Sequence, residues 1–336
     1  MEGKILNPTK TDSAISDLLI VSSSPHLRSN ESVKRIMLDV IIALIPAMIG
    51  SVYFFGLNAL KLILISIASA LFFEAVIQKM LKKEISINDY SAVITGILLA
   101  FNLPANAPWW IAVFGSGFAI IIVKQLFGGL GSNFMNPALA ARAVLLTSWP
   151  NIMSNFVLPG ADAITGATPL AIMKYGAADA GASATVAQAA AELPSILNMF
   201  IGNRGGAIGE TSALLLLIGG LYLLIRKVID WKIPVIYIAT TAVFLLLLGV
   251  ETDQLVYHIL GGGLILGAFY MATDYSSGAI TPIGQIIFAF GAGALTALIR
   301  VKGGFPEGVS YSILLMNVAA PLIDKFTAPR VFGRSK

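Results

Sequence analysis

The amino-acid sequence predicts an all-α polytopic membrane protein, with ten transmembrane segments arranged as two inverted repeats of five. Three features carry this prediction: the composition, the spacing of the apolar runs, and a similarity between the two halves. Hydrophobic residues make up 57% of the 336 residues and charged residues 12%, whereas a soluble globular protein has about 25% charged residues. With a strongly positive mean hydropathy, this composition places the chain in a lipid membrane, where one helical bundle can absorb its whole length.

Ten apolar runs follow one another along the chain, and each predicts a helix. They cover residues 36–56, 59–78, 90–103, 109–127, 137–149, 212–225, 233–250, 256–272, 283–299 and 309–323. A helix needs roughly 20 residues to cross the hydrocarbon core, and the third, fifth, sixth and tenth runs are notably shorter. These short runs predict half-helices, or helices that their neighbours shelter from lipid.

The lysine and arginine residues predict the orientation in the membrane. With the amino terminus in the cytoplasm, 17 of them fall on the inner side and 5 on the outer side, as the positive-inside rule expects. We therefore expect a multi-pass protein of the inner (cytoplasmic) membrane with both termini in the cytoplasm. The expected parts are a cytoplasmic segment (1–35), a first membrane repeat (36–149), an extracytoplasmic loop (150–211), a second membrane repeat (212–324) and a cytoplasmic tail (325–336).

An internal similarity relates the two halves. Phe114 is followed ten residues later by Lys124, Phe290 is followed ten residues later by Arg300, and a glycine pair follows each basic residue. Because each unit holds five segments, an odd number, the second unit enters the membrane inverted; chance similarity between apolar segments is the alternative. Polar interruptions at 102–108 and 273–282 lie at equivalent positions, and we expect both helix breaks to flank a functional centre.

The chain contains no cysteine. This excludes disulfides, as well as iron–sulfur clusters or structural zinc held by thiolates of this chain alone. We predict no metal ligands and no complete catalytic site on the chain, so any metal redox centre belongs to a partner. The basic charge balance needs no nucleic acid to explain it, because the topology rule and contact with anionic lipid account for it.

Four ionisable residues lie in or beside apolar runs, where such groups are expensive and usually functional. They are Glu74, Arg142, Glu210 and Asp274. A structural pair with a carboxylate is the alternative role of Arg142. Helix capping is the alternative role of Glu210 and Asp274.

The long loop after the fifth run holds a motif with possible chemistry, Asp162-Ala-Ile-Thr-Gly-Ala-Thr168. Pro169 favours an extended Thr168 and fits the first position of a short helix, which we expect to run through Tyr175 and to end at Gly176. Thr168 is then the residue that caps the helix, and a helix amino terminus stabilises a phosphate group. Lys174 lies close in sequence, and the small residues before Thr168 are expected to leave its hydroxyl open. An ordinary capping threonine is the other interpretation.

The motif resembles the Asp-x-x-Ser/Thr-Gly-Ala-Thr flavinylation motif, in which a flavin transferase joins FMN through its phosphate to the final threonine. The setting, ten membrane segments with this loop after the fifth, resembles the family that holds the D subunit of Rnf complexes and the B subunit of sodium-pumping NADH:quinone reductases. The likeness covers nearly the whole chain. Position 163 is Ala where many copies of the motif have Gly, a change between two small residues.

This resemblance implies a subunit of a membrane complex that couples electron flow between ferredoxin and NAD to Na⁺ or H⁺ translocation. It implies covalent FMN on Thr168, with Thr165, Gly166, Ala167 and Lys174 beside it, and a fold similar to urea and ammonium channels. It also implies a non-covalent second flavin, riboflavin, for which Asp274 is the candidate contact. The implied partners are a second FMN-bearing subunit, iron–sulfur subunits and the flavin transferase. The alternatives are a solute channel of the urea or ammonium class and a scaffold without cofactor.

Overall fold

The computed structural model describes residues 32–83, 85–159, 165–179, 193–210 and 212–329. By its contacts the chain divides into residues 1–32 and 33–336, and every element named below belongs to the second unit. In the part of the chain that is described, this unit consists of helices, one pair of two-residue strands and an isolated β-bridge. The structure is therefore mostly helical, as the sequence predicts.

The helices of the first half follow the first five apolar runs to within a few residues. They are α2 (Val33–Phe55), α3 (Leu57–Met80), α4 (Ser91–Phe101), α5 (Trp109–Gly117) with its π-helical continuation η3 (Phe118–Gln125), and α6 (Pro137–Ser148); a single 3₁₀ turn, η2 (Ile87–Asp89), precedes α4. The sequence explains the start of α6: the side chain of Asn136 accepts hydrogen bonds from the first turn, and proline occupies the first helical position.

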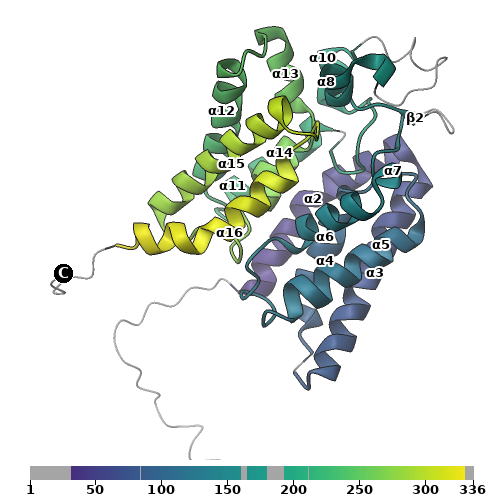
Figure 1. Cartoon of the computed structure of the whole chain (residues 1–336). Coiled ribbons are helices and arrows are strands. Elements are labelled where there is room, and N and C mark those ends of the chain that lie inside the picture. The colour runs from purple at the N-terminus through teal and green to yellow at the C-terminus, as the bar shows by residue number, and fades with distance from the viewer. Residues whose placement is uncertain (1–31, 84, 160–164, 180–192, 211, 330–336) are drawn as a thin grey trace, which may run out of the picture. The chain divides into compact units, whose positions relative to one another are not determined.

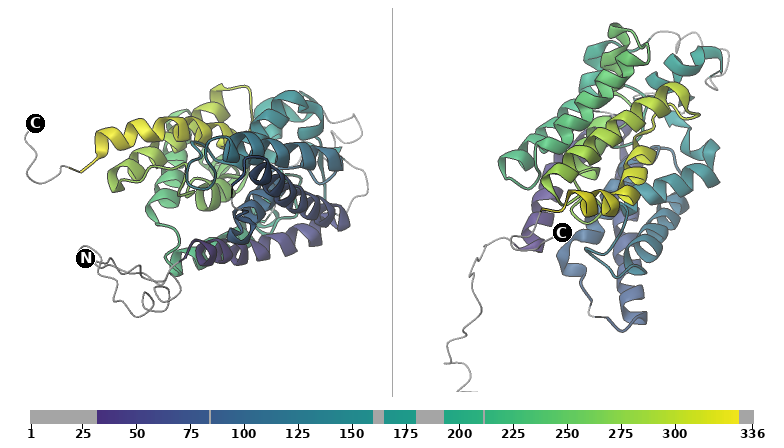
Figure 2. Two further views of the ribbon diagram at one scale, coloured as in Figure 1. Left: turned by 90° about the horizontal axis from the view of Figure 1, so that it is seen from below. Right: turned by 60° about the vertical axis from the view of Figure 1, so that its left-hand side comes forward.

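The helices of the second half match the remaining runs. They are α11 (Ala213–Ile225), α12 (Lys232–Leu247), α13 (Thr252–Leu260), α14 (Leu264–Leu266) with its π-helical continuation η4 (Gly267–Met271), α15 (Pro282–Lys302) and α16 (Val309–Thr327). Figure 1 shows α4, α5 and α6 grouped together, and α12, α15 and α16 grouped together. The two groups can be followed from two further sides in Figure 2.

The eighth apolar run differs from the prediction of one continuous helix. It is broken between α13 and α14, and the two pieces are bent by 58°. The cause is a run of three glycines, because Gly262 and Gly263 have φ angles of 62° and 66°, in the left-handed region that other residues rarely adopt. The break places backbone carbonyl groups inside the bundle.

Within the described ranges, four helices are long and apolar enough to cross a membrane: α2, α3, α15 and α16. The bent pair qualifies as a fifth span if it is counted as one, and five further apolar helices are shorter. The short helix α4 is sheltered as its length predicts, since ten of its eleven residues are buried. A side chain at Gly96 would place its Cβ 2.8 Å from Ile67 Cα, so this glycine permits the close approach of α3.

The connection between the halves carries short elements. They are α7 (Pro150–Met153), β1 (Phe156–Val157) paired antiparallel with β2 (Thr165–Gly166), α8 (Pro169–Asp179) and α10 (Ile196–Ile201). Figure 1 shows α8 and α10 beside α13 at one end of the bundle, and both helices contact α13.

The chain after α10 returns into the first half. The backbone N–H of Ile208 donates to the carbonyl of Leu103, and that of Gly209 donates to the carbonyl of Phe101, both at 2.9 Å. Pro104 forms a β-bridge with Ala207. These bonds satisfy backbone groups that the break at 102–108 exposes, as backbone at membrane depth requires. The first predicted break is thereby confirmed, and it lies against the segment that holds Glu210.

Candidate functional site

Thr168 lies at the amino terminus of α8, as predicted. Its Oγ1 accepts a hydrogen bond of 3.3 Å from the backbone N–H of Ala171, which is the geometry of a capping residue. The helix is longer than expected, because α8 continues through Gly176 to Asp179. The prediction that Gly176 ends it is therefore wrong: glycine lowers helix propensity but does not terminate a helix that neighbouring residues continue.

The hydroxyl of Thr168 is not open to solvent. The residue is 4% exposed, Gly166 and Ala167 are half-buried, and a Cβ at Gly166 would lie 3.2 Å from the side chain of Leu158. The expectation of a sterically open hydroxyl is wrong for this conformation, because Thr168 is buried and the side chain of Leu158 packs on Gly166. For Thr165 the structure describes only its place in β2, and Asp162 and Ala163 lie outside the described residues.

Lys174 does not reach the threonine. Its ammonium group donates to the carbonyls of Ile299 (3.3 Å), Gly303 and Phe305 (3.0 Å), and the hydroxyl of Tyr175 donates to the carbonyl of Gly304. These acceptors end α15 and begin the loop after it, where a cation complements the helix dipole. Burial lowers the pKa of Lys174 below its ordinary value. The residue anchors α8 to the second half.

The polar interruption at 273–282 also holds a threonine before a proline, Thr281, and its hydroxyl makes hydrogen bonds within the chain. Oγ1 of Thr281 accepts from the backbone N–H of Gly284 at 3.0 Å and donates to the carboxylate of Asp324 at 3.2 Å. The backbone N–H of Thr281 donates to the same carboxylate at 3.1 Å. Thr281 therefore caps α15 and fastens it to α16.

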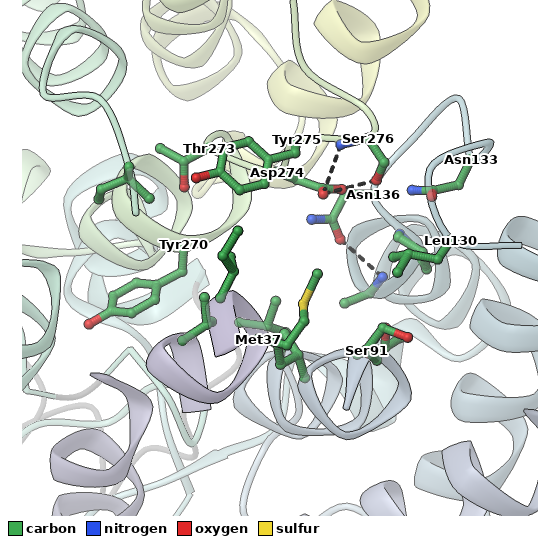
Figure 3. A pocket seen from close by; sticks show the side chains of 18 of the residues that line it. Met37, Ser91, Leu130, Asn133, Asn136, Tyr270, Thr273, Asp274, Tyr275 and Ser276 are labelled. Atoms are coloured by element: carbon green, nitrogen blue, oxygen red, sulfur yellow. Dashed lines mark hydrogen bonds between the residues drawn. The ribbon is translucent and has the colours of Figure 1, made fainter. Parts of the chain in front are cut away.

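A pocket lies between the two halves. Figure 3 shows its labelled side chains, which come from α2, α4, the segment before α6, and η4 with the loop that follows it. The walls are mainly apolar, and its polar groups are Ser91, Thr95, Lys124, Asn133, Asn136, Thr273, Asp274 and Ser276. A mainly apolar pocket with a few converging polar groups is typical of a cofactor site.

Asp274 lines this pocket, but its carboxylate is occupied. It accepts hydrogen bonds from Ser276, through the backbone at 3.2 Å and the hydroxyl at 3.0 Å, and from the hydroxyl of Ser277 at 2.8 Å. These bonds fix the turn at the second predicted helix break. Asp274 does not cap a helix, because the next helix, α15, begins at Pro282 and is capped by Thr281. The first break contributes no residue to the pocket, and the expectation that both breaks flank this one centre is not met.

Asn136 and Lys124 belong to the pocket, although the sequence alone assigned them no role in a site. Asn136 caps α6 and its Nδ2 donates to the carbonyl of Met271 at 3.4 Å, which joins the two halves. Lys124 donates to Glu74 Oε1 and to Ser91 Oγ, both at 2.6 Å. The sequence did contain a sign of both roles, because Lys124 is an ionisable residue at the end of an apolar run and Asn136 precedes a proline.

Arg142, Glu210 and three further ionisable residues form a buried charged cluster at the other end of the bundle. Arg142 forms an ion pair with Glu307 and donates to Asn102 Oδ1 at 2.8 Å. The remaining members, Arg204 and Arg300, donate to backbone carbonyls around the glycine break. The structural-pair role therefore holds for Arg142, and the cluster joins the first break, the loop before α11 and the break after α13.

Comparison with known proteins adds to this geometry. A model of the NQR2, RnfD, RnfE family matches residues 20–333. The chain is 56% identical over 321 residues to the D subunit of the Na⁺-translocating ferredoxin:NAD⁺ oxidoreductase complex of Acetobacterium woodii, covering 95% of this chain and 96% of that protein. It is 47% identical over 324 residues to the D subunit of the proton-translocating ferredoxin:NAD⁺ oxidoreductase complex of Clostridium ljungdahlii, covering 94% and 97%. It is 42% identical over 336 residues to the D subunit of the ion-translocating oxidoreductase complex of Stutzerimonas stutzeri, covering 90% and 93%.

Proposed function

The chain belongs to the NQR2, RnfD, RnfE family, and from this premise we propose that it is the D subunit, a membrane component, of an ion-translocating ferredoxin:NAD⁺ oxidoreductase complex. Two relatives that match over at least 94% of the chain are named D subunits of ferredoxin:NAD⁺ oxidoreductase complexes, and a third is named the D subunit of an ion-translocating oxidoreductase complex. They favour an electron-transfer protein over a solute channel of similar fold. The absence of cysteine from the sequence assigns thiolate-held clusters to other subunits.

We propose further that Thr168 carries FMN through a phosphoester bond. The observation that carries this proposal is the place of its hydroxyl, at the amino terminus of an eleven-residue helix, where backbone N–H groups stabilise a phosphate. FMN bound there would supply a one-electron carrier. Within this motif the chain itself contributes the hydroxyl, the helix terminus and the small residues Gly166 and Ala167; Lys174 contributes by fixing α8 rather than by touching the phosphate.

The burial of Thr168 sets a condition on attachment. A flavin transferase must reach the hydroxyl, which is buried in the conformation in which Lys174 and Tyr175 bind the end of α15. We therefore place the attachment step before α8 docks. Thr281, which is already bound to Asp324 and lacks the spacing of the motif, is not a site of attachment.

The test is a pair of variants, Thr168→Val and Thr281→Val, each co-expressed with a flavin transferase. Valine keeps the shape of threonine and removes the hydroxyl. Loss of flavin fluorescence from the denatured band of Thr168→Val alone supports the assignment. Fluorescence that persists in Thr168→Val, or that is lost only in Thr281→Val, would overturn it.

The second flavin, riboflavin, is proposed to bind in the pocket between the halves. The pocket offers apolar walls for a flat ring, and amide and hydroxyl groups for its polar edge. Asn136, Ser91 and Asp274 are the candidate polar contacts, and each of them also makes hydrogen bonds within the chain.

We also propose that the ten apolar helical segments are ten membrane spans in two inverted repeats. Equivalent contacts in the two halves support this. Lys124 reaches Ser91 at the start of α4, and its counterpart Arg300 reaches Gly262, directly before α14. The residues that precede these two helices, Tyr90 and Gly263, have similar left-handed φ angles of 62° and 66°.

The proposed topology places both termini in the cytoplasm and α8 outside it, in the inner membrane. Among the described residues, four basic side chains are buried: Lys124, Arg142, Arg204 and Arg300. Lys124 and Arg142 were counted on the inner side, and Arg204 and Arg300 on the outer side. Without them the counts of 17 and 5 become 15 and 3, so the remaining charges favour the orientation more strongly. The contacts of α15 agree with this topology, because α8 binds the carboxyl-terminal end of α15, whereas Asp324 of α16 binds its amino-terminal end. The proposed partners are the remaining subunits of the complex, including an FMN-bearing and iron–sulfur subunits, and the transferase.

A further inference from the structure

Glu210 lies in the segment between α10 and α11, outside the membrane helices, and its carboxyl group is enclosed. The residue is 3% exposed, and its Oε2 has no hydrogen-bond partner among the described residues. An ionised carboxylate with an unsatisfied oxygen is expensive to bury. The position therefore favours a carboxyl group that carries a proton for part of its working cycle.

Two glycines make the space for this carboxyl group. A Cβ at Gly206 would lie 2.9 Å from Oε1, and a Cβ at Gly263 would lie 3.2 Å from Oε2. Gly206 belongs to the same segment as Glu210, whereas Gly263 belongs to the break between α13 and α14. The carboxyl group is thus held between the connecting segment and the second half, directly beside a broken helix, where ion sites in transport proteins tend to lie.

The charged neighbours come from every element packed against the site. Arg204 lies on the same segment and donates to the carbonyls of Glu210 (2.5 Å) and Leu260 (2.9 Å). The others are Arg142 of α6, Glu307 of the loop before α16 and Arg300 of α15. A titratable side chain, His258 of α13, lies beside Arg300. Burial and Glu307 raise the pKa of Glu210, and Arg204 and Arg142 oppose them, with a net value of about 7.

Three guanidinium groups around one carboxyl group disfavour a metal cation, which they repel. The same guanidinium groups also favour the ionised carboxylate, but burial and Glu307 outweigh them, so a proton is the ion that this position can exchange. Arg142 and Glu307, which both act electrostatically on Glu210, also line a neighbouring pocket.

We infer that the carboxyl group of Glu210 is a proton-binding site, and that it takes up and releases a proton through the pocket lined by Arg142 and Glu307. As a step in ion movement by the assembled complex this rests on the proposed function. The protonation itself is a property of this chain alone, and it is measurable without flavin or partners.

The test is infrared spectroscopy of the full chain in lipid nanodiscs, titrated with acid and base. We expect the C=O stretching band of a protonated carboxyl group to titrate near pH 7, far above the roughly 4.3 of an exposed glutamate. The band should be absent in Glu210→Gln. It should remain in Glu307→Gln, with a lower midpoint because a neighbouring negative charge is removed, and in Glu251→Gln, which alters an exposed residue.

A band that persists in Glu210→Gln would overturn the inference, and so would a midpoint near that of an exposed carboxyl group. A midpoint that falls on addition of Na⁺ would also overturn it, because it would make the site a cation site. Should Glu210→Gln fail to fold, Glu210→Asp keeps the carboxyl group and must shift the band. Flavin fluorescence of Thr168 reports separately on the proposed function, so the two failures are distinguishable.

Discussion

The ammonium group of Lys124 lies 2.6 Å from the carboxylate of Glu74, and both side chains are almost fully buried. Glu74 also accepts from Gln125 at 2.8 Å, while its second oxygen has no partner among the described residues. Breaking such a pair by removing one partner leaves an uncompensated charge in the bundle.

Lys124→Met should therefore lower stability by about 3–5 kcal/mol. The double variant Lys124→Met with Glu74→Gln should recover most of this loss, because it removes the stranded charge. Thermal unfolding in detergent, followed by circular dichroism, measures both. Equal losses in the single and double variants would contradict the assignment of the cost to Glu74.

Gly262→Ala should destabilise the break between α13 and α14 more than Gly249→Ala destabilises its turn. Both positions have positive φ angles, so each variant carries the left-handed strain of about 1–2 kcal/mol. Only at Gly262 would the added methyl overlap Leu170 and lie 2.7 Å from the Arg300 guanidinium, whereas nothing lies within 4 Å at Gly249. A difference in melting temperature between the two variants isolates the crowding; similar values would show that Gly262 serves backbone freedom alone.

Asn136→Ala should lower stability by about 0.5–2 kcal/mol, the range for loss of a capping residue. Asn136→Asp keeps the oxygen that caps α6 but lacks the donor to the carbonyl of Met271. Its stability should be closer to that of the native chain. If Asn136 contacts the second flavin, both variants should retain less non-covalent flavin through purification of the complex, measured as the flavin that acid precipitation releases into the supernatant. Native retention in both would remove Asn136 from the flavin site.

Stability should depend on pH through Glu210. Burial and Glu307 raise its folded pKa to about 7 from the ordinary value of 4.5, so the folded state holds this proton more tightly than the unfolded state. The contribution of this proton to the free energy of unfolding is fully present below the unfolded pKa and is lost as pH rises through about 7. Unfolding midpoints from pH 5 to 8 should fall more steeply for the native chain than for Glu210→Gln, and parallel curves would contradict the shift.

The topology is open to a direct measurement, because the native chain contains no cysteine. A single cysteine at position 180 should react with a membrane-impermeant maleimide from outside the cytoplasm. A cysteine replacing Lys82, in the connection between α3 and α4, should react only from the cytoplasmic side. Reaction of position 180 from the cytoplasmic side alone would reverse the assignment.

The helices could be predicted from the sequence because each apolar run is bounded by polar residues, glycine or proline. The break at Gly261–Gly263 was missed because three glycines within an apolar run leave hydropathy unchanged, and only backbone geometry reveals their left-handed conformations. The short helix α4 was recognised from its length, since a helix too short to span the membrane must be covered by protein.

The threonine site was predicted in part. The cap at Thr168 follows from Thr-Pro at a helix start, which is a local rule. The burial of the hydroxyl and the place of Lys174 depend on α15, which lies more than a hundred residues further along the chain, and no local pattern carries that information. The same applies to the pocket, whose walls come from both halves.

The anchor of α8 has a consequence for how this protein can vary in evolution. Lys174 and Tyr175 bind the backbone carbonyls of Ile299, Gly303, Gly304 and Phe305, not their side chains. Every residue type offers the same carbonyl, so the receiving segment is free to change its side chains without losing the anchor. Selection on this contact falls on Lys174 and Tyr175, because their side chains, not their backbones, supply the donors.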